Sequence, residues 1–170
     1  MPQAHLGGYH LNQLPAALSR LAQLRVCYFG GCCRHAAGEA PPSPPLPGGA
    51  WLHSLQWLGA GIGTLLRSTA VLREATRLEC LFIDNCDGAD VDWDSPAAGA
   101  LFHWLACHPP LRRVSVDEGD YYHSKVFESG GFLVRIMQLW RRRRSLRVHC
   151  PGLGDEGQML LSRLRHKHPF

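Results

Sequence analysis

The chain has 170 residues, of which 45% are hydrophobic and 19% charged, so its composition fits one folded domain and argues against a disordered protein. The net charge of +4 gives only a weak preference for acidic partners. The chain lacks an apolar run of membrane-spanning length and a signal-like first segment, and its cysteine number is odd. We therefore expect a cytoplasmic or nuclear protein with reduced thiols and no membrane association.

The first part of the chain predicts a helix, a strand and a long loop. Leucines at three- and four-residue spacing predict a helix over 11–21, and a strand follows over 24–29. Proline and glycine dominate residues 34–50, which predicts an exposed, mobile loop inserted into a single domain of residues 1–170. Apolar spacing then predicts one helix or two shorter helices over 51–75, weakened in the middle by three glycines.

The second part predicts alternating strands and helices. Apolar alternation predicts strands over 78–83, 114–116 and 146–148. An acidic turn over 84–93 precedes a helix over 95–107, which Ser95 can cap and Pro96 can begin. A polar loop over 117–124 leads to a helix over 127–140, and a short amphipathic helix through Met159, Leu160 and Leu164 follows the last strand.

One apolar pattern recurs four times. Its copies are Leu24-x-x-Cys27-x-Phe29-x-x-Cys32, Leu78-x-x-Leu81-x-Ile83-x-x-Cys86, Leu111-x-x-Val114-x-Val116-x-x-Gly119 and the partial Leu146-x-Val148. The last strand positions lie 54, 33 and 32 residues apart, and leaving out roughly twenty residues of the Pro/Gly-rich loop equalises the first interval. The spacing predicts an α/β fold of about four strand–helix units, with one short parallel sheet in chain order.

These motifs resemble the leucine-rich repeat superfamily, and they are similar to the irregular repeats of plant and green-algal F-box-type proteins. The likeness is carried by residues 75–86 and 108–116, with weaker support from 21–26. It implies a curved solenoid with the sheet on its concave side, used for protein recognition, and an F-box-type substrate-recognition region as one possible role.

Three features depart from the family pattern. The intervals exceed the usual repeat length of roughly 20–29 residues. The usual asparagine position holds Cys32, Cys86 and Gly119, and no F-box-like segment precedes the repeats. Because the chain begins directly on a predicted helix without a clear cap, we expect a fragment of a longer repeat array.

Strand residues between the buried positions should project onto the concave face, because strand side chains alternate. The predicted partner-binding residues are Tyr28, Phe82, Asp84, Arg113, Ser115, Asp117, Arg147 and His149. We expect a non-catalytic scaffold that binds a protein partner, with Phe82 and Arg113 as anchors and with no cofactor or small-molecule substrate. The alternative is a purely structural interpretation, in which Tyr28 and Phe82 only cover the core.

The alternative function is that of a nucleotide-binding, Rossmann-like enzyme fragment. Gly59, Gly61 and Gly63 approach the dinucleotide-binding fingerprint, and Asp84 lies 25 residues after Gly59. Thr64 stands where the third fingerprint glycine would be expected, and residues 54–58 resemble a helix more than the required strand. We therefore expect a connector and no nucleotide site.

Other clusters have ordinary structural interpretations. Cys27, Cys32, Cys33 and His35 lack the usual spacing of zinc ligands, so no metal site is predicted. The arginine run 141–144 could contact nucleic-acid phosphates, but its place at a helix end favours a solvated terminus, and no nucleic-acid partner is expected. The aspartates of 84–94 lack the features of a calcium loop, and no catalytic set can be proposed among the histidines.

Overall fold

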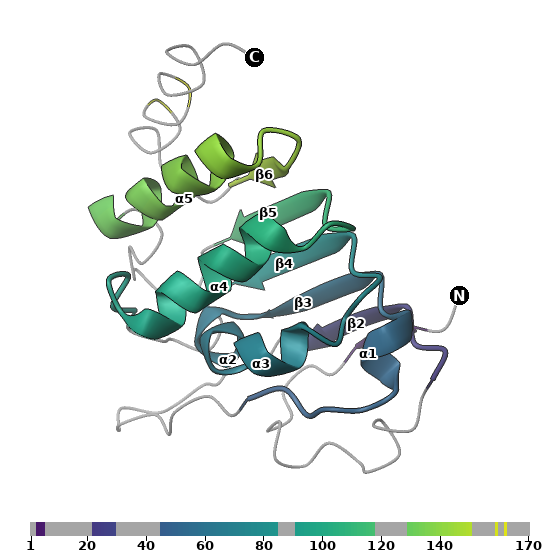
Figure 1. Cartoon of the computed structure of the whole chain (residues 1–170). Coiled ribbons are helices and arrows are strands. Elements are labelled where there is room, and N and C mark those ends of the chain that lie inside the picture. Colours follow the sequence, from purple (N-terminus) through teal and green to yellow (C-terminus); the bar gives the residue numbers. More distant parts are fainter. Residues whose placement is uncertain are drawn as a thin grey trace.

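A computed structural model describes residues 3–5, 22–29, 45–84, 91–117 and 129–150, together with the single positions 159 and 162. Within these residues the chain forms one six-stranded, fully parallel sheet whose strands follow each other in chain order (Figure 1). The strands are β1 (Gln3–His5), β2 (Val26–Phe29), β3 (Trp57–Gly61), β4 (Cys80–Asp84), β5 (Arg113–Asp117) and β6 (Arg147–His149). The predicted α/β class with a parallel sheet is confirmed, but the sheet has two strands, β1 and β3, beyond the four predicted, and β1 precedes the helix with which the chain was expected to begin.

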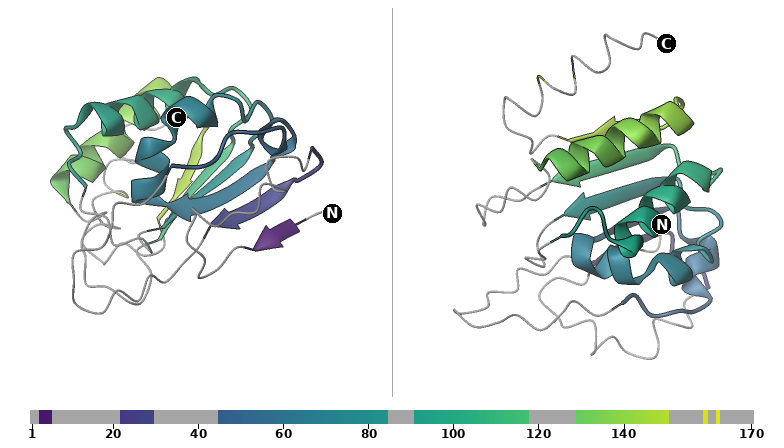
Figure 2. Two further views of the ribbon diagram at one scale, coloured as in Figure 1. Left: turned by 90° about the horizontal axis from the view of Figure 1, so that it is seen from below. Right: turned by 60° about the vertical axis from the view of Figure 1, so that its left-hand side comes forward.

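The described helices pack on one face of this sheet, as two further views show (Figure 2). They are α1 (Trp51–Ser54), α2 (Ile62–Arg67), α3 (Thr69–Leu72), α4 (Pro96–Cys107) and α5 (Gly130–Arg142). The helix predicted over 95–107 is confirmed: the Ser95 hydroxyl accepts a hydrogen bond from the Ala98 N–H at 3.2 Å. Ser129 caps α5 in the same way, through the Phe132 N–H.

The helix predicted over 51–75 is wrong for its middle part, because Trp57–Gly61 form strand β3. Leu55-x-x-Leu58-x-Ala60 is a further copy of the apolar pattern, and it forms a strand between β2 and β4. The strands of Phe29 and Ile83 are therefore not neighbours, and the 54-residue interval divides into 31 and 23 residues. The sequence is ambiguous here because leucines three residues apart fit both a helix and the start of this pattern.

The same turn leads into each of the strands β3 to β6. A buried leucine at the turn donates its N–H to the carbonyl three residues earlier, at 3.1–3.2 Å; these leucines are Leu55, Leu78, Leu111 and Leu146. The carbonyl of the residue after the leucine accepts N–H groups from the start of the next strand, as Gln56 does from Glu79 and Cys80. Successive units are thus joined by one recurring hydrogen-bond pattern.

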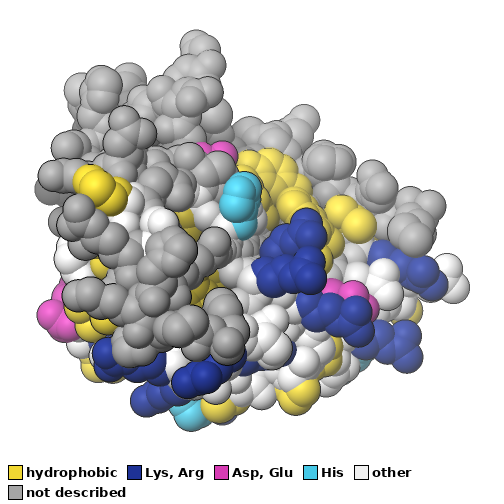
Figure 3. Space-filling model, turned by 90° about the horizontal axis from the view of Figure 1, so that it is seen from above, with side chains coloured by type: hydrophobic (Ala, Val, Ile, Leu, Met, Phe, Trp, Pro, Cys, Tyr) yellow, Lys and Arg dark blue, Asp and Glu magenta, His cyan; other side chains and the backbone are white. Residues whose placement is uncertain are grey.

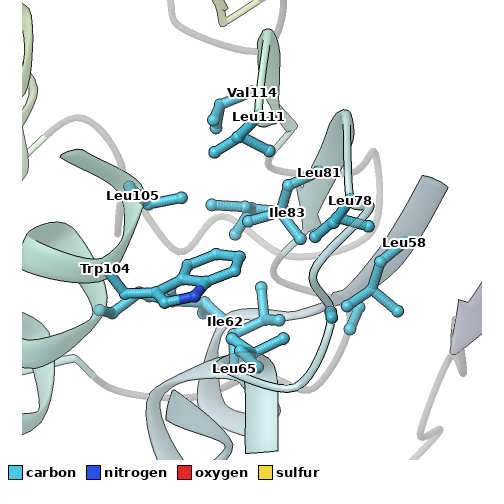
Figure 4. Packing of buried hydrophobic residues seen from close by; sticks show 14 of the residues in the cluster. Leu58, Ile62, Leu65, Leu78, Leu81, Ile83, Trp104, Leu105, Leu111 and Val114 are labelled. Carbon is cyan, nitrogen blue, oxygen red and sulfur yellow. The ribbon is translucent and has the colours of Figure 1, made fainter. Parts of the chain in front are cut away.

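The core lies between the sheet and the helices. One ladder of paired, buried strand residues runs across five strands through Cys27, Leu58, Leu81, Val114 and Val148. Leu105 and the Trp104 ring of α4 lie on the helix side of this core, with Ile62 and Leu65 of α2 (Figure 4). No helix within the described residues packs on the opposite face of the sheet.

The end of the predicted Pro/Gly-rich loop is packed. Leu46 is buried, and its N–H donates to the Ser68 hydroxyl at 2.8 Å. The expected exposed loop of residues 34–50 therefore does not hold for Leu46, because this leucine fills space beside the short helices. The rest of that loop before residue 45, the predicted helix over 11–21, the last helix around Leu160 and Leu164, and positions 32, 86 and 119 lie outside the described residues.

Candidate functional site

The sheet face opposite the helices, called here the open face, holds all eight residues that the strand alternation predicts. The strand pairing aligns them in three rows that run across the sheet. The first row is Val26, Trp57, Cys80, Arg113 and Arg147, the second is Tyr28, Gly59, Phe82, Ser115 and His149, and the third is Gly61, Asp84 and Asp117. The structure thus brings the predicted residues together on one surface, and whether they bind a partner stays a prediction.

Three aromatic rings form a cluster on the open face, and we call it the aromatic cluster. The rings of Trp57 and Phe82 stack with centroids 6.3 Å apart, and Tyr28 contacts both at 6.1–6.2 Å in tilted geometries. All three side chains are half-buried, so each still presents ring surface to the exterior. Sequence reasoning missed Trp57 because its strand was predicted to be helical.

Gly59 makes the space that this cluster occupies. A Cβ atom at Gly59 would lie 2.4 Å from Tyr28 Cδ2 and 2.8 Å from the end of the Trp57 ring. Both distances are far below van der Waals contact, so the two rings pack directly over the glycine backbone. Gly59 thus has a structural role that explains why a residue without a side chain stands in mid-strand.

Asp84 is placed on the open face but is buried, with 4% of its surface exposed. Its Oδ2 accepts a hydrogen bond of 2.9 Å from the Tyr28 hydroxyl. A carboxylate in this position fixes the tyrosine ring, so Asp84 contributes to the shape of the surface more than to its exposed charge. Asp117, its partner on β5, is half-buried.

The β5–β6 half of the open face carries two arginines. Arg113 and Arg147 are paired across β5 and β6, and both side chains are exposed. Within the part of the chain that the structure describes, neither guanidinium group forms an ion pair. His149 is exposed on the same strand as Arg147. Figure 3, which views the molecule from above Figure 1, shows Lys and Arg side chains beside a histidine and hydrophobic surface.

Cys80 lies between the aromatic cluster and the arginine pair. Its side chain is half-buried, and burial raises the pKa of the thiol, while the nearby charge of Arg113 opposes that shift. The thiol is therefore neutral at physiological pH. Because this side chain is small and neutral, it places neither bulk nor charge between Trp57 and Arg113.

The arginine run needs a correction at one position. Arg141, Arg142 and Arg144 are exposed at the end of α5, as a solvated helix terminus requires. Arg143 instead turns inward, and its guanidinium group donates to four carbonyl oxygens at the C-terminal end of α4, those of Leu105, His108, Pro109 and Leu111. Burial lowers the pKa of Arg143, although four acceptors satisfy the cation. Its role is to join α5 to α4.

The glycine motif also differs from its predicted setting. A strand does precede the helix, which removes one objection to nucleotide binding, yet Gly59 lies inside β3 under the aromatic rings. Gly61 ends the strand and is directly followed by α2, a helix of six residues, so no glycine loop stands between them. Within the described residues the strands follow one another in chain order, so this part of the sheet lacks the strand-order reversal at which Rossmann-type sites form.

The four residues that were considered and rejected as zinc ligands lie only partly within the described residues. Cys27 is completely buried on the helix side of β2, and burial raises its pKa to about 12, which keeps the thiol protonated. A protonated thiol is a poor zinc ligand. Cys32, Cys33 and His35 lie outside the described residues, and within those residues no group of three or more His, Cys, Asp or Glu side chains is placed to hold a metal ion.

The acidic segment is described at its two ends. Asp84 belongs to the open face, while Asp92 begins the turn before α4, where its Oδ1 accepts from the Asp94 N–H at 2.9 Å. Asp87 and Asp90 lie outside the described residues. Asp92 and Asp94 thus have the ordinary role of polar residues in a turn.

Comparison with known proteins adds no assignment. No protein-family model matches the chain, and neither a curated protein nor a solved structure matches it. None of the helices within the described residues is long and apolar enough to cross a membrane. The functional interpretation therefore depends on the geometry of the open face.

Proposed function

We propose that this chain is a non-catalytic interaction scaffold that binds a protein partner on the open face of its parallel sheet. The observation that carries the proposal is the aromatic cluster. Trp57, Phe82 and Tyr28 remain partly exposed on a sheet face that no described helix covers. Aromatic side chains with this partial exposure are frequent anchors of protein interfaces, since they bury large areas at low entropic cost.

The arrangement of the units supports a repeat scaffold similar to leucine-rich repeats. Strands in chain order, helices on one face and a recurring leucine turn are all features of stacked strand–helix units. Within this proposal the resemblance to F-box-type proteins favours substrate recognition in ubiquitin ligation. Co-purification of ubiquitin-ligase subunits with the full chain tests that narrower role.

The experiment compares partner capture by three forms of the full chain. Beads carrying the parent chain, Trp57→Ala/Phe82→Ala or Val134→Ala are incubated with cell extract, and captured proteins are quantified by mass spectrometry. Val134 is the matched control, because it is 50% exposed on α5, in the layer opposite the open face. We expect one set of proteins to be lost by about tenfold or more with the aromatic variant only.

Two results would contradict the proposal. Equal capture by the parent and the aromatic variant places the binding surface elsewhere. Loss with Val134→Ala alone assigns binding to the helical layer. Melting curves of the three forms establish that the aromatic variant is folded before its capture is compared.

A further inference from the structure

The open face has an uneven distribution of charge and apolar surface. Its β2–β4 half carries the aromatic cluster, whereas its β5–β6 half carries the exposed side chains of Arg113 and Arg147. The carboxylate of Asp84, at the opposite end of the strands, is buried against Tyr28. A ligand that lies across the strands therefore meets apolar rings first and two cations next.

The two arginines are suited to an anionic group. Because paired residues on adjacent strands are about 4.8 Å apart, the two guanidinium groups can converge on one carboxylate. Within the described residues no acidic side chain pairs with either of them, so each keeps its donors for a ligand. Two like charges side by side also repel each other, and a bound anion removes that repulsion.

The first row sets the distance between the apolar and the acidic groups of the ligand. Arg113 and Arg147 lie two and three strands from Trp57, which corresponds to about 10 and 14 Å. An extended peptide advances about 3.3 Å per residue and presents every second side chain to one face. Residues i and i+4 of such a peptide are therefore separated by about 13 Å and match this spacing.

We propose that the open face holds an extended acidic segment of the protein partner, with an apolar side chain on the aromatic cluster and an Asp or Glu four residues away between Arg113 and Arg147. This inference rests on the proposed function and adds the chemistry of the partner. The neutral Cys80 thiol lies between the two contacts and repels neither part of the segment.

Nucleic acid fits this surface less well. Binding to a phosphate backbone needs a continuous basic track, and the open face offers two adjacent arginines. Arg141 and Arg142 belong to the last turn of α5, in the helical layer on the other side of the sheet. An acidic peptide needs only the local charge that is present.

The test selects ligands without assuming a sequence. A phage-displayed library of random peptides of about twelve residues, long enough to cross the sheet when extended, is selected on the full chain. We expect enriched peptides to carry Asp or Glu four residues from an aromatic or large aliphatic residue. Their affinity, measured by fluorescence anisotropy, should fall when salt rises from about 50 to about 300 mM.

Variants of the full chain separate the two proposals. Arg113→Gln/Arg147→Gln should weaken the enriched peptides by about tenfold or more, whereas Arg141→Gln/Arg144→Gln, with the same charge change, should alter affinity less than about twofold. Apolar peptides that need Trp57 and Phe82 but ignore the arginine pair would overturn the acidic-segment inference and leave the proposed function standing. Failure to enrich any peptide that depends on the aromatic cluster counts against both.

Two other occupants have their own signatures. If a single-stranded oligonucleotide binds more tightly than the selected peptides, and Arg113→Gln/Arg147→Gln abolishes this binding, the ligand is nucleic acid. Self-association in sedimentation experiments, lost with Trp57→Ala/Phe82→Ala, replaces it with a second copy of the chain. Either result overturns the inference.

Discussion

The hydroxyl of Tyr28 donates a hydrogen bond of 2.9 Å to Asp84 Oδ2, although a whole strand lies between the two residues. Tyr28 is paired with Gly59 of that strand, and Asp84 is paired with Gly61. Because neither glycine has a side chain, the tyrosine can cross β3 and reach the carboxylate. The spacing that resembles a nucleotide fingerprint thus has a structural purpose on the open face.

Gly59→Ala should destabilise the chain by about 1–3 kcal/mol, since the added methyl group forces Tyr28 and Trp57 out of their packed positions. Gly99→Ala on α4 is the matched control, because a Cβ at Gly99 meets no atom within 4 Å. That control should gain about 0.5–1 kcal/mol from the higher helix propensity of alanine. Urea unfolding measures both, and equal free energies of unfolding for the two variants would contradict the close packing over Gly59.

Arg143→Ala should destabilise the chain by about 1.5–3 kcal/mol, because a half-buried cation then no longer donates to the carbonyl oxygens that end α4. Arg144→Ala removes an exposed arginine next to it and should change stability by less than about 0.5 kcal/mol. Thermal melting of the pair is the measurement. Similar melting temperatures for both variants would indicate that Arg143 is a solvated helix-end residue, as its sequence context predicts.

The sequence predicts most of the sheet because the apolar pattern is local. Ile83 and Val116 stand in short alternating runs, and such runs of β-branched and leucine residues have few alternatives to a strand. β3 was not predicted because Leu55 and Leu58, three residues apart, fit a helical period as well as they fit the strand pattern. Since these residues were predicted to be helical, neither Trp57 nor the aromatic cluster was predicted as part of the open face.

Other features depend on contacts between distant residues, which local patterns do not contain. Arg143 is one of four consecutive arginines, and only the position of the α4 carbonyl oxygens distinguishes it from its neighbours. The burial of Asp84 likewise depends on Tyr28, which lies 56 residues earlier in the chain. The sequence predicts which strand residues lie on the open face, but it does not predict which of those residues are exposed and which are buried.

His108 should make stability fall in mild acid. Its side chain is buried and stacks on Trp104 at 4.8 Å, and burial, followed by the charge of Arg143, lowers its pKa from the ordinary value of 6.5. The unfolded chain therefore binds a proton more readily than the folded chain. The stability that neutral His108 supports is present above pH 6.5 and is lost as the pH falls towards the folded-state pKa.

Urea unfolding at about pH 7.5 and about pH 5.5 tests this sign, because these values bracket the unfolded-state titration. His108→Phe keeps an aromatic ring beside Trp104 and removes the titration, so it should lose less stability in acid than the parent chain. His103→Gln, at an exposed position of α4, should behave as the parent does. An unchanged acid loss in His108→Phe assigns the effect to other groups.

The cysteines should react in the order of their exposure. Cys107 is exposed, with its Sγ 3.7 Å from His103 Nε2, so iodoacetamide should alkylate it rapidly in the folded chain. Cys27 is completely buried and its pKa is raised to about 12, so both access and thiolate formation are blocked. Alkylation of Cys27 should therefore follow the unfolding of the chain, and its rate should rise in Leu81→Ala, because this change opens a cavity in the core and destabilises the fold. Tandem mass spectrometry must assign each site, because Cys32 and Cys33 lie in the same tryptic peptide as Cys27. Rapid labelling of Cys27 in the folded chain, or its protection by added Zn²⁺, would contradict the burial and reopen the question of a metal site at this strand.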